Sequence, residues 1–125
     1  MTRVYKSYAG PDDYVGRVER NGRVYGQRAG PDEYLGRVEE NGRIYAHEPG
    51  PDRYLGRVEE NGRIYRHEPG GPDANVGRVE ENGKVYARRR GAAPDDLIGR
   101  VEGDPALLAG GAAFFLLLGG EGEEA

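Results

Sequence analysis

Arginine, glutamate and tyrosine recur at fixed positions along this sequence, and they are the residues best suited to bind a ligand. Each arginine follows the glycine of a Gly-Arg-Val-Glu motif, and residues two apart on a strand share a face. Guanidinium groups pair with carboxylates and phosphates and stack on aromatic rings. One hypothesis is therefore a groove for a repetitive anionic or carbohydrate ligand, with the tyrosines as stacking surfaces. The candidate ligand-binding residues are Arg17, Arg37, Arg57, Arg78, Arg100, Tyr25, Tyr45, Tyr65 and Tyr86.

The same residue types also suit a purely structural role on the outside of a sheet. Cross-strand ion pairs can form there, with tyrosine rings covering the arginine stems. The glutamates of this network would be Glu19, Glu39, Glu59, Glu80 and Glu102. Catalytic sites are usually asymmetric, whereas these residues recur in every copy of the motif. We favour the structural interpretation and keep the ligand groove as the alternative.

Residues typical of enzymes and metal sites are sparse. The chain has no cysteine, and its single serine, Ser7, is the one residue on which a Ser-His-Asp site could be built. It also has no phosphate-binding glycine loop of the P-loop or dinucleotide type. The two histidines, His47 and His67, occupy the same repeat position on neighbouring hairpins, where about 9–10 Å would separate the backbones. That spacing is wide for one shared metal ion. We therefore predict no catalytic residue, no cofactor and no metal site.

These residues are positioned by an internal repeat. The glycine of the motif falls at Gly16, Gly36, Gly56, Gly77 and Gly99, in steps of 20, 20, 21 and 22 residues. Each copy reads as two strands, because Val, Ile and Tyr favour strands and Asn-Gly is a strong hairpin signal. Gly-Pro-Asp segments connect successive copies, where proline does not interrupt a ladder. The 22 glycines and the regular spacing of Tyr and Val indicate tight turns rather than disorder.

The turn decides which residues face inward. A two-residue Asn-Gly loop would pair Val38 with Tyr45, whereas a three-residue Glu-Asn-Gly loop with a bulge would pair Val38 with Ile44. We prefer the bulged register because it separates apolar from polar side chains more cleanly. It would place Tyr34, Gly36, Val38 and Ile44 on one face, and Leu35, Arg37, Glu39, Arg43, Tyr45 and His47 on the other.

The two ends of the repeat region complement each other. The chain starts with the second strand of a repeat, and the last copy, LIGRVEGDP, is a first strand without a second. Pairing of residues 2–7 with residues 97–102 would remove the exposed sheet edges. We therefore predict an all-β fold with one short C-terminal helix: a closed ten-stranded up-and-down barrel. An open ribbon remains the alternative.

The C-terminal segment differs from the repeats in containing a long uncharged stretch. Residues 106–118 are apolar all round, which requires burial in protein or lipid. Thirteen helical residues span about 20 Å, less than a bilayer core of about 30 Å. We predict a helix that begins after an Asp104 N-cap, with Pro105 in its first turn, and that plugs the barrel where the inward glycines leave room. A self-association surface and a short membrane anchor are the alternatives.

The predicted organisation is a hairpin-repeat domain over residues 1–104, an apolar helix within 105–120 and an acidic tail at 121–125. The formal net charge is −4, and the basic run Arg88, Arg89 and Arg90 is more typical of solvated charge than of a nucleic-acid site. We expect no nucleic-acid partner. Because the first residues contain no apolar signal segment, a cytoplasmic location is the default expectation.

The pattern GRVxxNGxVY resembles tandem hairpin repeats in uncharacterised bacterial proteins that end in a short Ala/Leu/Gly-rich tail. That resemblance covers nearly the whole chain and implies a cytoplasmic bacterial protein, without implying an activity. YLGRVEENG is also similar to the opening of a MORN repeat, although the later glycines of that repeat are missing. Together these features predict a non-enzymatic structural or protein-interaction module that binds an unidentified protein or associates with itself.

Overall fold

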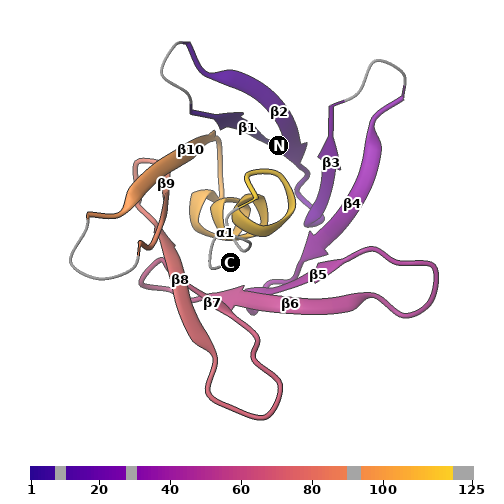
Figure 1. The fold of residues 1–125 in the computed structure, drawn as a ribbon. Helices are drawn as coiled ribbons and strands as arrows, with labels where there is room; N and C mark the ends of the chain where they lie inside the picture. Colours follow the sequence, from indigo (N-terminus) through magenta and orange to yellow (C-terminus); the bar gives the residue numbers. More distant parts are fainter. Residues whose placement is uncertain (8–10, 28–30, 90–93, 120–125) are drawn as a thin grey trace.

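The computed structural model describes residues 1–7, 11–27, 31–89 and 94–119, and within them the chain forms a closed antiparallel barrel around one helix (Figure 1). The strands are β1 (Thr2–Lys6), β2 (Asp13–Val18), β3 (Arg23–Gly26), β4 (Glu33–Val38), β5 (Arg43–Ala46), β6 (Arg53–Val58), β7 (Arg63–Arg66), β8 (Ala74–Val79), β9 (Lys84–Ala87) and β10 (Asp96–Glu102), followed by α1 (Ala106–Leu116). The predicted fold class is confirmed. Gly10, Gly30, Arg90 and the predicted tail 121–125 lie outside the described residues.

The barrel closes between the first and last strands, as the half-repeats predicted. Strand β1 pairs antiparallel with β10, with Arg3 opposite Glu102 and Lys6 opposite Gly99. Beyond the strand end, the Ser7 amide donates to the Ile98 carbonyl at 3.1 Å. The last strand thereby supplies the hairpin partner that the first strand lacks.

The Asn-Gly turns have the predicted three-residue form. Val38 pairs with Ile44, Gly42 has φ +92°, and the Arg43 amide donates to the Asn41 side-chain oxygen at 3.0 Å. The turn also binds the next repeat, because the Val58 amide donates to the Gly42 carbonyl at 2.9 Å. Equivalent bonds recur around the ring, so each turn fixes the position of the following hairpin.

A bulge corrects one part of the predicted face assignment. Between β3 and β4, Val24 pairs with Gly36 but Tyr25 pairs with Tyr34, so Leu35 is an extra residue on β4. The bulge reverses the alternation of side chains beyond that point. Tyr34 consequently stacks on Tyr25 on the outer face, and Leu35 lies against Gly26. The prediction that Tyr34 faces inward was wrong because it assumed an unbroken alternation along β4.

The helix α1 fills the barrel interior. Its buried residues run from Ala109 to Phe115, and Phe114 is 0% exposed. The strands contribute rings of small aliphatic side chains, chiefly valine and isoleucine, to the same core. The helix seen within the ring in Figure 1 is therefore the plug that the apolar tail predicted.

The start of the helix differs from the prediction in one respect. Pro105 occupies the N-cap and no side chain caps the helix, so the assignment of Asp104 as N-cap was wrong. Asp104 lies instead in the short segment that leads from the wall to the plug. Its carbonyl accepts a hydrogen bond from the Thr2 hydroxyl at 3.1 Å, which joins this segment to the first strand.

The five inward glycines form a belt around the end of the plug. A Cβ atom on Gly77 would lie 2.5 Å from the Phe114 ring, and one on Gly56 would lie 2.9 Å from the Phe115 ring. Gly36, Gly16 and Gly99 are opposed in the same way by Leu116, Leu117 and Leu118. Each glycine thus admits a different large side chain of the segment 114–118, as the predicted belt requires.

Candidate functional site

The predicted arginine and tyrosine residues lie together on the outer face, in pairs across the strands of each hairpin. The Arg37 guanidinium is 4.2 Å from the Tyr45 ring centroid, and Arg78 is 4.0 Å from that of Tyr86. Arg17 with Tyr25 and Arg57 with Tyr65 repeat this stack, each at 4.5 Å. The fifth arginine, Arg100, stacks on Tyr5 of the closing strand at 4.2 Å. Tyr5 was not among the predicted residues, although its place in a half-repeat could have indicated it.

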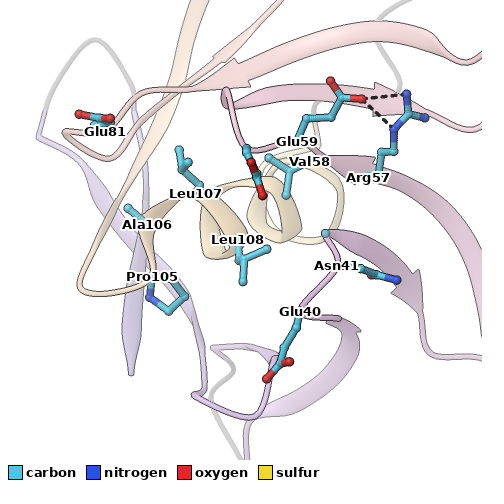
Figure 2. Close-up of a pocket in the computed structure, with 12 residues that line it drawn as sticks. Glu40, Asn41, Arg57, Val58, Glu59, Glu81, Pro105, Ala106, Leu107 and Leu108 are labelled. Carbon is cyan, nitrogen blue, oxygen red and sulfur yellow. Dashed lines mark hydrogen bonds and ion pairs between the residues drawn. The ribbon is translucent and has the colours of Figure 1, made fainter.

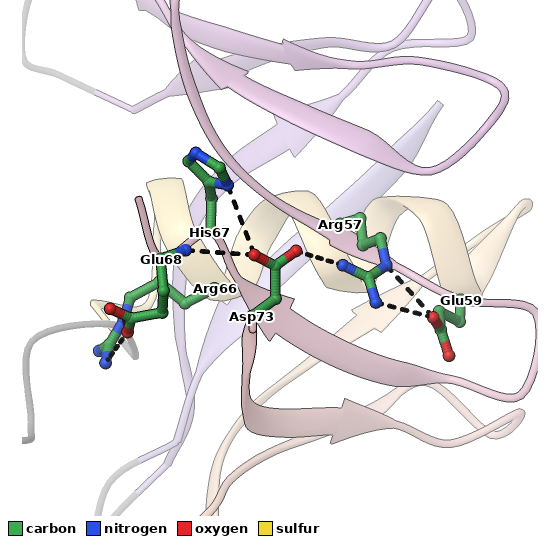
Figure 3. Close-up of polar contacts among 6 residues, drawn as sticks. All are labelled: Arg57, Glu59, Arg66, His67, Glu68 and Asp73. Carbon is green, nitrogen blue, oxygen red and sulfur yellow. Dashed lines mark hydrogen bonds and ion pairs between the residues drawn. The ribbon is translucent and has the colours of Figure 1, made fainter. Parts of the chain in front are cut away.

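Each of these arginines also bridges two carboxylates. Arg57 pairs with Glu59 on its own strand and with Asp73 of the following repeat (Figure 3). The predicted glutamate partners are present in all five copies, but the aspartate partners were not predicted. The Asp partners of Arg17, Arg37, Arg57, Arg78 and Arg100 are Asp32, Asp52, Asp73, Asp95 and Asp12, respectively. The recurring Pro-Asp dipeptide was the signal that could have found them.

Neighbouring groups in this outer network favour the charged forms of Arg17, Arg57 and Asp73. The pKa of Asp73 is lowered, chiefly by the backbone N–H of Glu68, which donates to its carboxylate at 3.2 Å, and further by Arg57. For Arg57 the largest single effect, burial, lowers the pKa, but the combined pull of Glu59 and Asp73 outweighs it and the net shift is upward. The guanidinium donors of the ring are therefore already engaged by the protein itself.

The two histidines belong to the same network. The His67 Nδ1 atom lies 3.4 Å from an Asp73 oxygen (Figure 3), and His47 lies 3.5 Å from Asp52. Each imidazole also stacks on a tyrosine from the first strand of its own hairpin, His67 on Tyr54 and His47 on Tyr34. Among the described residues no three His, Asp or Glu side chains are grouped to hold a metal ion.

A recess opens at the Asn-Gly end of the barrel, beside the first turn of α1 (Figure 2). Its volume is about 700 Å³. The apolar part of its lining comes from Val58 of the wall and from Pro105, Ala106, Leu107 and Leu108, of which the last three are half-buried. The first turn of the plug is therefore accessible from outside at this recess.

The rim of this recess is acidic. Glu40, Glu60 and Glu81 are exposed and form no ion pair within the described part of the chain, whereas Glu59 is held by Arg57. All three free glutamates occupy the repeat position just before Asn-Gly, which the first repeat fills with Arg20. A smaller recess of about 350 Å³ on the other side of the helix includes Arg20, Glu40 and Leu108. We call the larger depression the acidic mouth.

The sequence contained the components of the acidic mouth but did not predict it. The change from Arg20 to glutamate in later copies was visible, and so was the apolar tail. Their proximity depends on the direction in which the helix enters, and the short segment 103–105 makes α1 begin at the Asn-Gly end. Only this entry direction brings the leucines of the first turn beside the three glutamates.

No protein-family model, no curated protein and no solved structure matches this chain. Within the described residues, no helix has the length and apolar character needed to cross a membrane.

Proposed function

We propose that this barrel is a non-enzymatic protein-interaction module whose acidic mouth receives a basic, amphipathic segment of a partner protein. The observation that carries the proposal is the combination, at one recess, of half-buried Leu107 and Leu108 with three glutamates that have no ion-pair partner among the described residues. Long basic side chains place apolar stems on such a floor and keep their charged ends at the rim. Complementary charge of this kind favours encounter and orientation more than raw affinity.

The remaining surface supports a structural rather than a catalytic role. The interior is occupied by α1, and the repeated arginines are engaged by carboxylates and tyrosines of the same chain. A repetitive anionic or carbohydrate ligand on the Arg and Tyr rings would have to displace these intramolecular partners. A membrane-anchoring role for residues 105–118 would require the helix to leave the core. The acidic mouth needs neither rearrangement.

Binding of a short amphipathic Lys/Leu peptide tests the proposal. We expect saturable binding that weakens with added salt, with NMR shifts concentrated at residues 105–108, and little binding of a matched Glu/Leu peptide. Glu60→Lys should weaken the binding several-fold. Glu48→Lys makes the same charge change just after β5, at the end of the wall away from the Asn-Gly turns, and should leave the binding unchanged.

Two results would overturn the proposal. One is peptide binding that Glu60→Lys and Glu48→Lys weaken equally, because the attraction would then come from overall charge. The other is a set of NMR shifts that avoids residues 105–108. Sedimentation measurements over a range of concentrations separate a second copy of this chain from a different protein as the occupant.

A further inference from the structure

The outer surface departs from its repeat at strand β8. In three hairpin contacts a tyrosine stacks on a tyrosine of the adjoining strand, as with Tyr45 and Tyr54, whose ring centroids are 5.4 Å apart. At the corresponding position, Tyr65 of β7 pairs with Asn75. The smaller side chain leaves a recess of about 220 Å³ near this position. It is lined by Arg63, Asn75, Gly77, Arg78, Arg88 and Asp95.

The substitution also leaves an arginine without its usual neighbour. Arg23 and Arg43, which occupy the same repeat position as Arg63, lie over Tyr34 and Tyr54 at 5.8 and 5.9 Å. Arg63 has Asn75 in place of that ring. Its side chain is exposed and forms no ion pair or hydrogen bond within the described residues. A guanidinium whose donors have no partner in the described part of the chain therefore lines the recess.

A second guanidinium, that of Arg88, lines the same recess. Arg88 occupies the repeat position of His47 and His67, which face aspartates, yet its side chain has no ion-pair partner in the described part of the chain. The third arginine, Arg78, is paired with Asp95 and Glu80. Among the described residues that line the recess, Asp95 is the only carboxylate; it is already engaged, and positive charge is in excess.

Asn75 adds neutral donors to this set. Its side-chain oxygen accepts a hydrogen bond from the Gly77 amide at 3.2 Å, which leaves the NH₂ group available to a ligand. Guanidinium and amide N–H groups match the acceptor oxygens of a phosphate, and guanidinium groups bind phosphate through paired hydrogen bonds. The recess is smaller than the usual pocket for a drug-sized molecule, about 300–1,000 Å³. Its size suits a single anionic group.

We propose that Arg63, Arg88 and Asn75 form a binding site for a phosphate group. The site lies on the outer wall, shares none of its described lining residues with the acidic mouth, and does not depend on the function proposed above. It arises where one repeat loses its tyrosine and gains an arginine. The bound group is either inorganic phosphate or the phosphate of a small organic monoester.

NMR titration of the full chain at constant ionic strength tests the site, with inorganic phosphate and O-phosphotyrosine as separate probes. We expect saturable shifts of the Asn75 side-chain amide and of the Arg63 and Arg88 Nε–H signals with at least one probe. Preference between the two probes identifies free or organic phosphate as the ligand. Acetate and chloride at equal ionic strength should produce no saturable shift.

Substitutions separate a built site from general attraction to a basic surface. Arg63→Gln and Arg88→Gln should each weaken binding by about tenfold, since hydrogen bonds to charged groups are the strong ones. Arg23→Gln is the matched control, because Arg23 lies over Tyr34, and it should leave the affinity unchanged. Asn75→Tyr restores the repeat pattern without changing charge and should abolish binding while the circular dichroism spectrum is retained.

The proposal is overturned if neither probe gives saturable shifts in the natural chain. It is equally overturned if a folded Asn75→Tyr variant binds as the natural chain does, or if Arg23→Gln and Arg63→Gln weaken binding equally.

Discussion

The inner and outer faces of the same strands follow opposite rules. On the outer face most repeated residues meet other repeated residues, as when Arg57 contacts Tyr65, Glu59 and Asp73. On the inner face the repeated glycines meet a helix that has no repeat. Gly77 faces Phe114, whereas Gly36 faces Leu116. The wall is therefore nearly symmetric outside and asymmetric where it contacts the plug.

Glycine makes this asymmetry possible. A ring of five equivalent positions surrounds a helix with 3.6 residues per turn, so the side chains of the plug cannot approach all five strands equivalently. A larger residue in every repeat would impose one spacing on five different contacts. Glycine imposes none, and the plug residues supply the volume that each direction requires. The same glycines also bring the wall close to the helix, since a Cβ on Gly56 would lie 2.9 Å from the Phe115 ring of α1.

Removing the plug should have the largest effect on stability and is the strongest test of this contrast. Deletion of residues 105–125 exposes the inner rings of Val and Ile that α1 now covers. We expect loss of cooperative thermal unfolding or conversion to aggregates, because the barrel wall alone has no core. Differential scanning calorimetry and sedimentation velocity measure the two outcomes. A truncated chain that stays monomeric and equally heat-stable would show that the wall does not depend on its plug.

The second-largest loss of stability should come from removing a single contact on the inner face. Phe114→Ala removes a ring that is 0% exposed and that opposes Gly77, where no wall side chain can fill the space. We expect a loss of about 3–5 kcal/mol in the free energy of unfolding. Leu97→Ala, at a position that is 44% exposed on β10, should cost much less. Chemical denaturation measures both, and equal losses would contradict a core centred on the plug.

The glycine belt can be tested from the wall side. Gly56→Ala places a methyl group 2.1 Å from a backbone carbonyl and 2.9 Å from the Phe115 ring, so the helix or the strand must shift. Such overpacking typically costs about 1–3 kcal/mol. The matched control is Gly50→Ala, where nothing lies within 4 Å of the added carbon. If thermal denaturation showed the same change for both variants, the belt would not be a packing requirement.

Much of this architecture could be predicted because the repeat specifies it locally. Asn41-Gly42 defines the turn, the turn sets the pairing of Val38 with Ile44, and the unmatched half-repeats predict closure between β1 and β10. The glycine of each motif then predicts an inward belt. These inferences depend on near neighbours or on a repeated position, which periodicity makes visible.

The less predictable features arise from irregularities and from contacts between distant residues. The bulge at Leu35 reverses the face of Tyr34, and alternation alone does not reveal it. The aspartate partners lie in the following repeat, so they depend on how neighbouring hairpins are aligned. The acidic mouth depends on the direction in which α1 enters, and the recess at Asn75 appears only when one repeat is compared with the others in space.

The smallest expected effect on stability comes from a single carboxylate on the outer face, Asp73. It can be detected by measuring melting temperature as a function of pH. The pKa of Asp73 is lowered in the folded chain, so its contribution to stability is present above the ordinary carboxyl pKa of about 4 and is lost as pH falls through the folded-state pKa. Asp73→Asn removes this contribution. We expect its melting temperature to lie slightly below that of the natural chain near neutral pH, with the gap closing below about pH 4. Glu40→Gln, at a carboxylate without an ion-pair partner among the described residues, should show no such convergence. A gap for Asp73→Asn that stays constant with pH would mean that packing, rather than charge, holds the outer network together.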